Sequence, residues 1–308
     1  ARRGSMHHAI AKMLCLHVPA LPPPSFTELE LEVPALVQIA ALLGIGLLYQ
    51  GCAHRLMTEV LLGEIGRQPT NELMGCRESY SLTAGIALGM LGLGHGSDAA
   101  GLADLQLEDK LGTYMHGQDP ALPFFLDDAG LRPPQGLATS RCYRIREGPT
   151  INIDVTAAGA TLALGLIFLK SNNSSVAAQL RLPQTMFALH SVRPDLILLR
   201  VVARGLIMWD DVRPTKTWFT SQLTPLMRSP RGIAPVERED EEAVRLANVN
   251  SAAGASVALG LRFAGSCCKP ACEMLMEQVR ELHSLRQACG GRNSRKAEKP
   301  TLEACLAA

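Results

Sequence analysis

The chain has 308 residues, enough for one large domain or two ordinary ones, and 47% of them are apolar. Thirty basic and 29 acidic side chains leave a net charge of +1, so there is no overall attraction to nucleic acid or to an anionic membrane surface. Aromatic residues make up only 4% of the chain, which favours closely packed helices over a β-sandwich or barrel. We therefore expect an all-α protein without a nucleic-acid partner.

One sequence pattern recurs along the chain: small residues, then Ala-Leu-Gly or a similar triplet, within an apolar stretch. The copies lie at residues 41–51, 83–94, 158–168, 203–209 and 253–265. Each copy contains a glycine at the corresponding point, which we name an anchor glycine: Gly46, Gly89, Gly165, Gly205 and Gly260. Successive anchors are separated by about one or two units of roughly 40 residues, a period typical of stacked helix pairs. The pattern predicts an α-α solenoid of about five helical hairpins.

The second helix of a hairpin is clearest at residues 53–65, where apolar residues fall at helical spacing and Gly66 ends the pattern. We expect one face to be formed by Ala53, Leu56, Met57, Val60 and Leu61. In the last hairpin, Glu241 and Glu242 suit the start of a helix that runs to Gly265. Pro270 then opens a second helix, which we expect to end before Gly290.

A glycine inside a helix costs about 1 kcal/mol relative to alanine, so a glycine in every copy needs a compensating contribution. Close approach of neighbouring helix backbones supplies one, because a glycine has no side chain to keep the helices apart. We therefore expect Gly165→Leu to push adjacent repeats apart and to lower the thermal stability of the domain.

The repeat pattern also predicts the domain boundaries. Residues 1–34 are expected to be an extension from a preceding repeat, and residues 35–289 the repeat domain. Two Pro- and Gly-containing stretches, 118–150 and 228–240, are expected to be loop insertions. Residues 290–308 are polar and basic and are expected to be a disordered tail.

The longest apolar runs, Ala35–Tyr49 and Val155–Leu169, are shorter than the ~20 residues that a membrane-spanning helix needs. We therefore expect buried helices and no membrane association. The nine cysteines are odd in number and scattered, which indicates reduced thiols in the nucleus or cytoplasm. The first residues do not resemble a signal peptide and lack a start methionine, which suggests an internal fragment.

Several short motifs could carry chemistry, but each also has a structural explanation. The glycines of 44–46 and 92–96 suggest phosphate binding, yet they lack the glycine spacing or the Lys-Ser/Thr ending of such loops. His95, Ser97 and Asp98 contain the residue types of a nucleophilic triad, but three neighbours in a turn cannot all point at one substrate. We expect helix packing for the first motif and a helix-capping turn for the second.

Other polar groups leave the same choice. Candidate zinc ligands are Cys267, Cys268, Cys272 and His283, which lack the paired spacing of a zinc site. Asp210 and Asp211, followed by Arg213, could serve acid–base chemistry, or form a helix end with a salt bridge. The 237–242 run is either a solvated helix start or a docking patch, and Ser221 and Ser229 are candidate phosphorylation sites. No catalytic, metal or cofactor residue is predicted.

Three blocks of sequence carry a more specific signal: residues 44–67, residues 77–90, and residues 151–156 with 159–164. They resemble the proteasome/cyclosome repeat in the form found in the largest subunit of the anaphase-promoting complex. The similarity continues through 198–211 and 259–265 and extends over about residues 1 to 285. The related scaffold subunits of the proteasome share the repeat but not the three blocks.

The resemblance implies a non-catalytic scaffold of a ubiquitin ligase that controls exit from mitosis, with repeats that curve into a closed ring. It also implies contacts with a Doc-domain subunit and a cullin-type subunit, and no small-molecule ligand. The alternatives are a scaffold of the proteasome regulatory particle, a truncated copy that does not assemble, a membrane protein with closely packed helices, and an enzyme.

Overall fold

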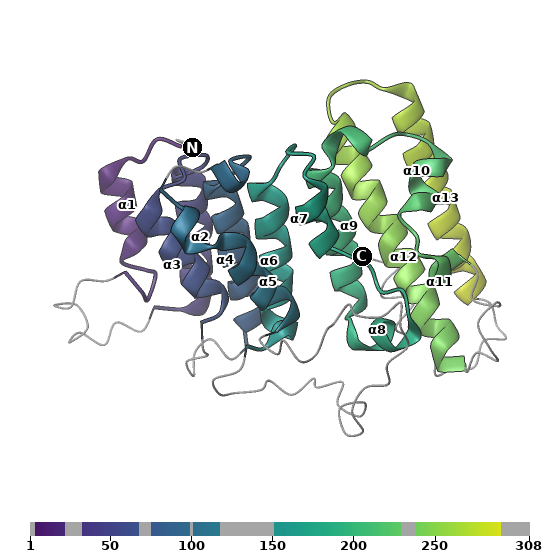
Figure 1. Ribbon diagram of the computed structural model, residues 1–308, viewed down its shortest axis with the longest axis horizontal. Helices are drawn as coiled ribbons and strands as arrows, with labels where there is room; N and C mark the ends of the chain where they lie inside the picture. The colour runs from purple at the N-terminus through teal and green to yellow at the C-terminus, as the bar shows by residue number, and fades with distance from the viewer. Residues whose placement is uncertain are drawn as a thin grey trace. The chain divides into compact units, whose positions relative to one another are not determined.

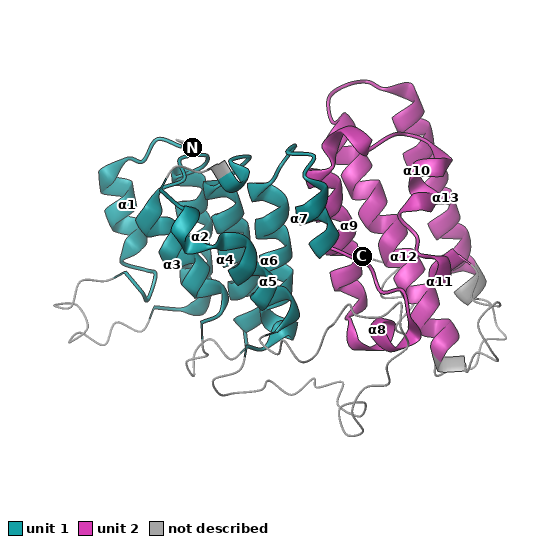
Figure 2. Cartoon of the chain, in the orientation of Figure 1, with its two compact units in different colours: residues 1–179 teal, residues 180–308 magenta. Residues whose placement is uncertain are grey.

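The computed structural model describes residues 4–21, 33–67, 75–98, 101–117, 151–228 and 238–290. In these ranges the ordered elements are helices, and no strand is present. The prediction of an all-α fold built from helix-pair repeats is therefore confirmed. The chain divides into two compact units, residues 1–179 and 180–308, which Figure 2 shows in different colours. Each unit is described by itself.

Unit 1 begins with a short helix and continues with three helical hairpins. Its helices are α1 (His8–Cys15), α2 (Ala35–Leu48), α3 (Arg55–Ile65), α4 (Arg77–Leu91), α5 (Leu107–His116), α6 (Ile153–Ile167) and α7 (Ser174–Gln179). Two short 3-10 helices, η3 (Gly96–Asp98) and η4 (Ala103–Leu105), lie between α4 and α5.

The helices of unit 1 form two layers. The first helix of each hairpin packs on the first helix of the next, so that α2, α4 and α6 form one row (Figure 1). The second helices cover this row, with α3 on α4 and α5 on α6, while α1 packs on α2. The row is apolar on more than one side because each of its helices contacts more than one other helix of the unit, and α6 buries residues on every turn.

Unit 2 contains two long helices and several short ones. Its helices are α8 (Met186–Ser191), α9 (Pro194–Ile207), η5 (Trp209–Asp211), α10 (Lys216–Ser221), α11 (Pro225–Arg228), α12 (Arg238–Phe263) and α13 (Lys269–Gly290). The core of the unit lies between α9 and α12, with α8, α11 and α13 also packed on α12 (Figure 1). Pro194 opens α9, since its fixed φ angle suits the first turn of a helix.

Five described helices carry the anchor glycines, namely α2, α4, α6, α9 and α12, as the repeat pattern predicts. We call them the inner helices. Whether the repeats close into a ring stays a prediction. The expected extension at 1–34 contains α1, and the backbone N–H of Gly4 donates to the carbonyl oxygen of Leu47 at 3.1 Å. Its origin in a preceding repeat also stays a prediction.

The helix in residues 53–65 differs from the expected one in its register. Ala53 lies outside α3 with a positive φ of 47°, and Leu56 is 52% exposed. The face buried in the core instead contains Met57, Thr58, Leu61, Leu62 and Ile65. The prediction that Ala53 and Leu56 belong to the buried face is therefore wrong. Apolar character alone does not distinguish two adjacent stripes of residues on a short helix.

The predicted boundaries of the last hairpin also need correction. Helix α12 begins at Arg238 and ends at Phe263, earlier at both ends than the expected Glu241 and Gly265. The predicted loop at 228–240 is therefore wrong at its ends: Arg228 belongs to α11 and residues 238–240 belong to α12. Helix α13 includes Gly290 instead of ending before it. The predicted loop at 118–150 and residues 291–308 of the predicted tail lie outside the described residues.

Candidate functional site

Three anchor glycines lie where an inner helix crosses its neighbour. A Cβ atom added to Gly46 of α2 would lie 2.6 Å from the Cα of Ala87 in α4. One added to Gly205 of α9 would lie 2.6 Å from the Cβ of Ala258 in α12. Real Cβ atoms essentially never approach other atoms so closely. Because these glycines have no side chain, the backbone of each helix can approach the Cα or Cβ atom of an alanine on the neighbouring helix, as expected.

The third of these crossings joins α4 to α6. A Cβ on Gly89 would lie 2.7 Å from the Cβ of Leu166 and 3.1 Å from the Cα of Ala163. The atoms nearest to Gly89 therefore belong to Leu166, and Ala163 lies just beyond them, whereas for Gly46 and Gly205 the nearest atom belongs to an alanine. Gly165 is itself buried within α6. The effect expected for Gly165→Leu stays a prediction.

These three crossings share one register. Each anchor glycine faces the alanine that stands two residues before the anchor of the next helix: Ala87 precedes Gly89, Ala163 precedes Gly165, and Ala258 precedes Gly260. All three alanines are buried. The approach of a glycine to an alanine at the same repeat position in all three crossings indicates that these helix pairs pack in a similar relative position, as a repeat fold requires.

The closest backbone contact involves glycines that were not predicted as anchors. A Cβ on Gly85 of α4 would lie 2.1 Å from the carbonyl oxygen of Gly159 in α6. In return, a Cβ on Gly159 would lie 2.4 Å from the carbonyl oxygen of Ser81. The two helices therefore touch backbone to backbone through a glycine on each side.

Unit 2 has a similar but one-sided contact. A Cβ on Gly254 of α12 would lie 2.6 Å from the carbonyl oxygen of Leu198 and 3.0 Å from the Cβ of Val201, both in α9. The other helix contributes residues with full side chains here. Gly254 therefore creates room for its neighbour instead of meeting a second glycine.

Gly260 does not have the close neighbour that was expected for it. Among the described residues, a Cβ at this position of α12 would meet no atom within 4 Å. The expectation of close packing at Gly260 is thus wrong within the described part of the chain, because no inner helix lies against that side of α12.

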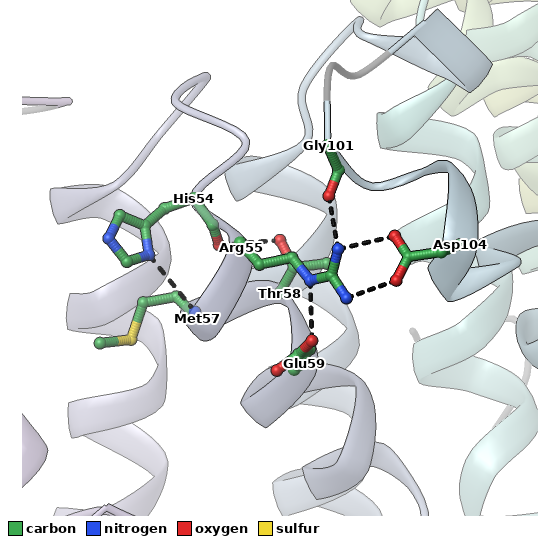
Figure 3. Close-up of polar contacts among 7 residues, drawn as sticks. All are labelled: His54, Arg55, Met57, Thr58, Glu59, Gly101 and Asp104. Carbon is green, nitrogen blue, oxygen red and sulfur yellow. Dashed lines mark hydrogen bonds and ion pairs between the residues drawn. The ribbon is translucent and has the colours of Figure 1, made fainter.

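An exposed polar cluster fastens the start of α3 to the 3-10 helix η4 (Figure 3). The guanidinium of Arg55 donates to both carboxylate oxygens of Asp104 at 2.6 and 2.5 Å, to Glu59 at 2.7 Å and to the carbonyl oxygen of Gly101 at 2.7 Å. Hydrogen bonds to Asp104 and Glu59 raise the pKa of Arg55, and the bond from Arg55 lowers the pKa of Asp104. Each of the three guanidinium nitrogens of Arg55 donates within the cluster, which indicates a structural role.

A second polar network joins α3 to α4 in the core. Glu64 is buried, accepts a hydrogen bond from the hydroxyl of Tyr80, and pairs with Arg67 at 2.9 Å. Burial raises the pKa of Tyr80, and the bond to the Glu64 carboxylate raises it further. Ser81 adds a bond from its hydroxyl to the carbonyl oxygen of Ile65 at 2.7 Å. A buried carboxylate is tolerated only when it is paired in this way.

The neighbours His95 and Ser97 do not point at one site. His95 Nε2 lies 2.9 Å from the carbonyl oxygen of Gly51, whereas the hydroxyl of Ser97 lies 3.4 Å from Glu108. Asp98 falls in η3. Gly94 and Gly96 have positive φ angles of 73° and 57°, so these glycines form the turn that follows α4. The helix-capping interpretation fits this arrangement.

The cysteines near the turn between α12 and α13 are not brought together as metal ligands. Cys267 and Cys272 are exposed free thiols, and His283 contacts Gln287 at 2.9 Å. In the described ranges, no three His, Cys, Asp or Glu side chains are placed to hold a metal ion. Within those same ranges, no helix combines the length and apolar character needed to cross a membrane.

Asp210, the first of the two carboxylates that follow α9, contacts an arginine that the sequence analysis missed. Arg262 of α12 approaches Asp210 at 3.9 Å, donates to the carbonyl oxygen of Trp209 at 3.2 Å, and lies 5.3 Å from the centre of the Trp209 ring. The expected salt bridge therefore involves Arg262, more than fifty residues away along the chain, and closes the end of the α9–α12 pair.

The remaining candidates lie at helix ends. Asp240 forms a hydrogen bond with His190 at 2.7 Å, and Glu241 forms an ion pair with Arg245 at 3.3 Å, so the described part of the 237–242 run is a helix start held by polar contacts. The hydroxyl of Ser221 donates to the carbonyl oxygen of Trp218 at 2.6 Å. Glu237 and Ser229 lie outside the described residues.

One buried charge was also missed. Arg200 in α9 is only 2% exposed, and its guanidinium donates to the carbonyl oxygen of Arg181 at 3.1 Å. Burial lowers the pKa of Arg200 to about 10, so this side chain remains charged at neutral pH. The sequence signal was present in the apolar run around it, since a single arginine within a buried helix is uncommon.

Comparison with known proteins identifies the family. Residues 8–308 match the family model described as APC1 fifth domain, beyond residue 285, where the resemblance was expected to end. The chain is 46% identical over 274 residues to anaphase-promoting complex subunit 1 of Mus musculus and, separately, of Homo sapiens. It is 37% identical over 319 residues to the protein of that name from Arabidopsis thaliana.

These alignments cover most of this chain and a small part of each relative. The mouse and human alignments include 86% of this chain and 14% of the relative, and the Arabidopsis alignment includes 99% and 18%. The matched family is the cyclosome one, and the assignment to a proteasome scaffold is set aside. The chain belongs to the anaphase-promoting complex subunit 1 family, in the part described as its fifth domain.

Proposed function

We propose that the chain is a non-catalytic scaffold segment of an anaphase-promoting complex, and that it supports ubiquitination during mitosis by holding other subunits in place. The observation that carries this proposal is the shared register of the glycine-on-alanine crossings, Gly46 on Ala87, Gly89 on Ala163 and Gly205 on Ala258. A fold that repeats one contact along its length provides an extended surface for partners, and does not need a cleft.

The polar side chains support the same role. The best-connected described groups, around Arg55 and Glu64, have partners on adjacent helices and hold those helices together. A catalytic site would instead need a nucleophile or a general base that is directed at open space. The proposed mechanism is therefore mechanical: rigid stacking fixes the distance between the surfaces that partners occupy.

The proposed partners are the other subunits of the complex, and in particular a Doc-domain subunit and a cullin-type subunit. The proposed location is the nucleus and the cytoplasm. Support comes from the names of the relatives, which are anaphase-promoting complex subunits. The rival is a truncated copy that folds without assembling.

The test is affinity purification of the tagged 308-residue chain from mitotic cells, followed by mass spectrometry. We expect the cullin-type and Doc-domain subunits to be recovered with the wild-type chain and with Gly63→Leu, because Gly63 is exposed on α3 and a Cβ there meets no described atom. Gly85→Leu should recover neither subunit, since it separates α4 from α6. Recovery of neither subunit with the wild-type chain would support the truncated copy, and proteasome subunits in their place would contradict the proposal.

A further inference from the structure

Three arginines come together on one side of helix α9. Arg200 and Arg204 are four residues apart, so they lie on the same side of the helix, one turn from each other. The guanidinium of Arg200 donates to the carbonyl oxygen of Arg181 at 3.1 Å, which holds the segment before α8 against this side. Arg200 lies roughly 100° around α9 from Val201, which packs against Gly254 of α12. We call Arg181, Arg200 and Arg204 the arginine face.

The arginine face has no carboxylate to balance it in the part of the chain that the structure describes. Within those residues, none of its three arginines forms an ion pair, whereas Arg193 at the start of the same helix pairs with Asp195 at 2.7 Å. Arg200 is only 2% exposed and bonds to an uncharged carbonyl group. It remains charged at neutral pH, although burial lowers its pKa to about 10. Because arginine is almost never this buried without an acidic partner, the charge of Arg200 calls for one.

The positive charge of this face extends to the surface. Arg181 and Arg204 are exposed, whereas Arg200 is buried and largely shielded from water. Like charges one helical turn apart repel each other, and a buried charge is screened much less by salt than an exposed one. An anionic group placed on this face would therefore be attracted by three charges and would relieve the repulsion among them.

We propose that the arginine face is a docking surface for an acidic segment of another subunit, whose Asp or Glu carboxylates pair with Arg181 and Arg204 above the buried charge of Arg200. This inference rests on the proposed scaffold function and gives the chemistry of one partner surface. Arginine suits a carboxylate because its planar guanidinium can bind both carboxylate oxygens at once. Arg55 binds Asp104 in this way elsewhere in the chain.

An acidic protein segment fits this face better than nucleic acid does. Nucleic-acid binding depends on a longer row of positive groups that follows the phosphate backbone. The whole chain has no such excess of positive charge, since its net charge is +1. A short acidic segment needs only a few carboxylates to match the arginine face, so charge complementarity favours a protein partner.

The test places a benzophenone amino acid at Gln184, an exposed residue close to Arg181 in the chain, in the protein as it exists in its complex in cells. After irradiation, the cross-linked peptide is identified by mass spectrometry, and the same amino acid at Gln287, exposed on α13, serves as the control. We expect a cross-link from position 184 to a segment of another subunit that contains a cluster of Asp or Glu residues, and none to that segment from position 287. Introducing Arg204→Gln should reduce the yield by about threefold, as expected for the loss of an exposed ion pair.

Two further variants show whether the charge itself is responsible. Arg204→Lys keeps the positive charge and should retain most of the yield, and Arg280→Gln, which removes an exposed arginine from α13, should leave the yield unchanged. Thermal unfolding of the 308-residue chain is the folding control. Because Arg204→Gln relieves repulsion from Arg200, its midpoint should be no lower than that of wild type, and a lower midpoint would contradict the repulsion on which the proposal depends.

The outcomes separate this inference from the proposed function. The docking proposal would be overturned by a cross-link to a segment without carboxylates, to a phosphorylated segment, to nucleic acid or to nothing, even if the other complex subunits are still recovered. A yield that Arg204→Gln leaves unchanged would also overturn it. Failure to recover those subunits would contradict the scaffold function, while the identity of the cross-linked segment would still decide what occupies the arginine face.

Discussion

The two units solve the same packing problem in different ways. In unit 1, Gly85 of α4 and Gly159 of α6 meet with a glycine on each side, so the backbones touch. In unit 2, Gly254 of α12 meets Leu198 and Val201 of α9, which keep their side chains. A two-sided glycine contact allows the closest approach but tolerates no added atom on either helix. The one-sided contact is less close, at 2.6 Å instead of 2.1 Å, so an added atom needs a smaller displacement of the helices.

The largest expected effect is therefore at the two-sided contact in unit 1. Alanine is favoured over glycine in a helix by about 1 kcal/mol, so Gly85→Ala would stabilise α4 if the position were open. Its Cβ would instead lie 2.1 Å from the Gly159 carbonyl oxygen, a backbone atom that cannot rotate away. We expect a net loss of about 3 kcal/mol, measured by denaturant unfolding of the chain.

Gly159→Ala should behave in the same way, because its Cβ would lie 2.4 Å from the Ser81 carbonyl oxygen. The matched control is Gly63→Ala, in which the same substitution is made at an exposed position of α3. Equal stability of Gly85→Ala and Gly63→Ala would disprove the two-sided contact.

The one-sided contact in unit 2 should respond less. Gly254→Ala brings a Cβ to 2.6 Å from the Leu198 carbonyl oxygen, which is less close than the 2.1 Å at Gly85, so a smaller displacement of the two helices relieves the overlap. We expect a loss of about 2 kcal/mol, smaller than that of Gly85→Ala, in the same unfolding experiment. A loss larger than that of Gly85→Ala would reverse the comparison between the units.

The sequence predicted the five inner helices but not which glycines matter most. Gly85 and Gly89 are four residues apart and so lie on one side of α4, whereas Gly159 and Gly165 are six apart and lie on different sides of α6. Choosing the glycine of the Ala-Leu-Gly triplet in these two copies therefore found the crossing at Gly89 and missed the one at Gly159. The spacing between the two glycines was the available signal.

Other features depend on contacts between distant parts of the chain. Asp104 reaches Arg55 across 49 residues, and the Trp209 carbonyl reaches Arg262 across 53. Neither pair has a local spacing that a sequence pattern could detect. Gly260 repeats the sequence pattern fully, yet its environment depends on a helix that the described chain does not place there.

The outer helices extend the comparison between the units. In unit 1, α3 is joined to α4 by the buried network of Glu64, Tyr80 and Arg67. In unit 2, α13 is joined to α10 by the pair Lys216–Glu277, in which the lysine side chain is 75% exposed. Because exposed pairs contribute little and buried polar groups need their partners, the first connection should be the stronger one.

We therefore expect Tyr80→Phe to lower the free energy of unfolding by about 1.5 kcal/mol, since it removes the hydroxyl donor from a buried carboxylate. Lys216→Met should change stability much less, with a difference that vanishes in high salt. Tyr114→Phe is the matched control for the phenol, because among the described residues its hydroxyl makes no hydrogen bond. An equal loss for Tyr114→Phe and Tyr80→Phe would contradict the role of the network.

The same network predicts a pH dependence. The folded state raises the pKa of Tyr80 above that of the unfolded chain, so folding favours the neutral phenol. Its contribution is therefore complete below about pH 10 and decreases as the pH rises above the pKa of the unfolded tyrosine. The difference in stability between wild type and Tyr80→Phe should shrink in that range, and a constant difference from pH 8 to pH 11 would argue against it.

The smallest expected effect has the opposite sign and concerns the anchor glycine that has no neighbour. In the 308-residue chain, Gly260→Ala adds a methyl group where it meets no described atom, so the helix preference of alanine should be gained without a collision. We expect an increase in stability of about 0.5 to 1 kcal/mol, as for Gly63→Ala, measured by the shift of the unfolding midpoint. Gly205→Ala, with its Cβ 2.6 Å from Ala258, should instead be destabilised. Gly260 and Gly205 occupy the same place in their repeats. A loss of stability in both variants would mean that another part of the chain covers α12. A gain of stability in both would show that the glycine-on-alanine register is not the basis of the helix stacking.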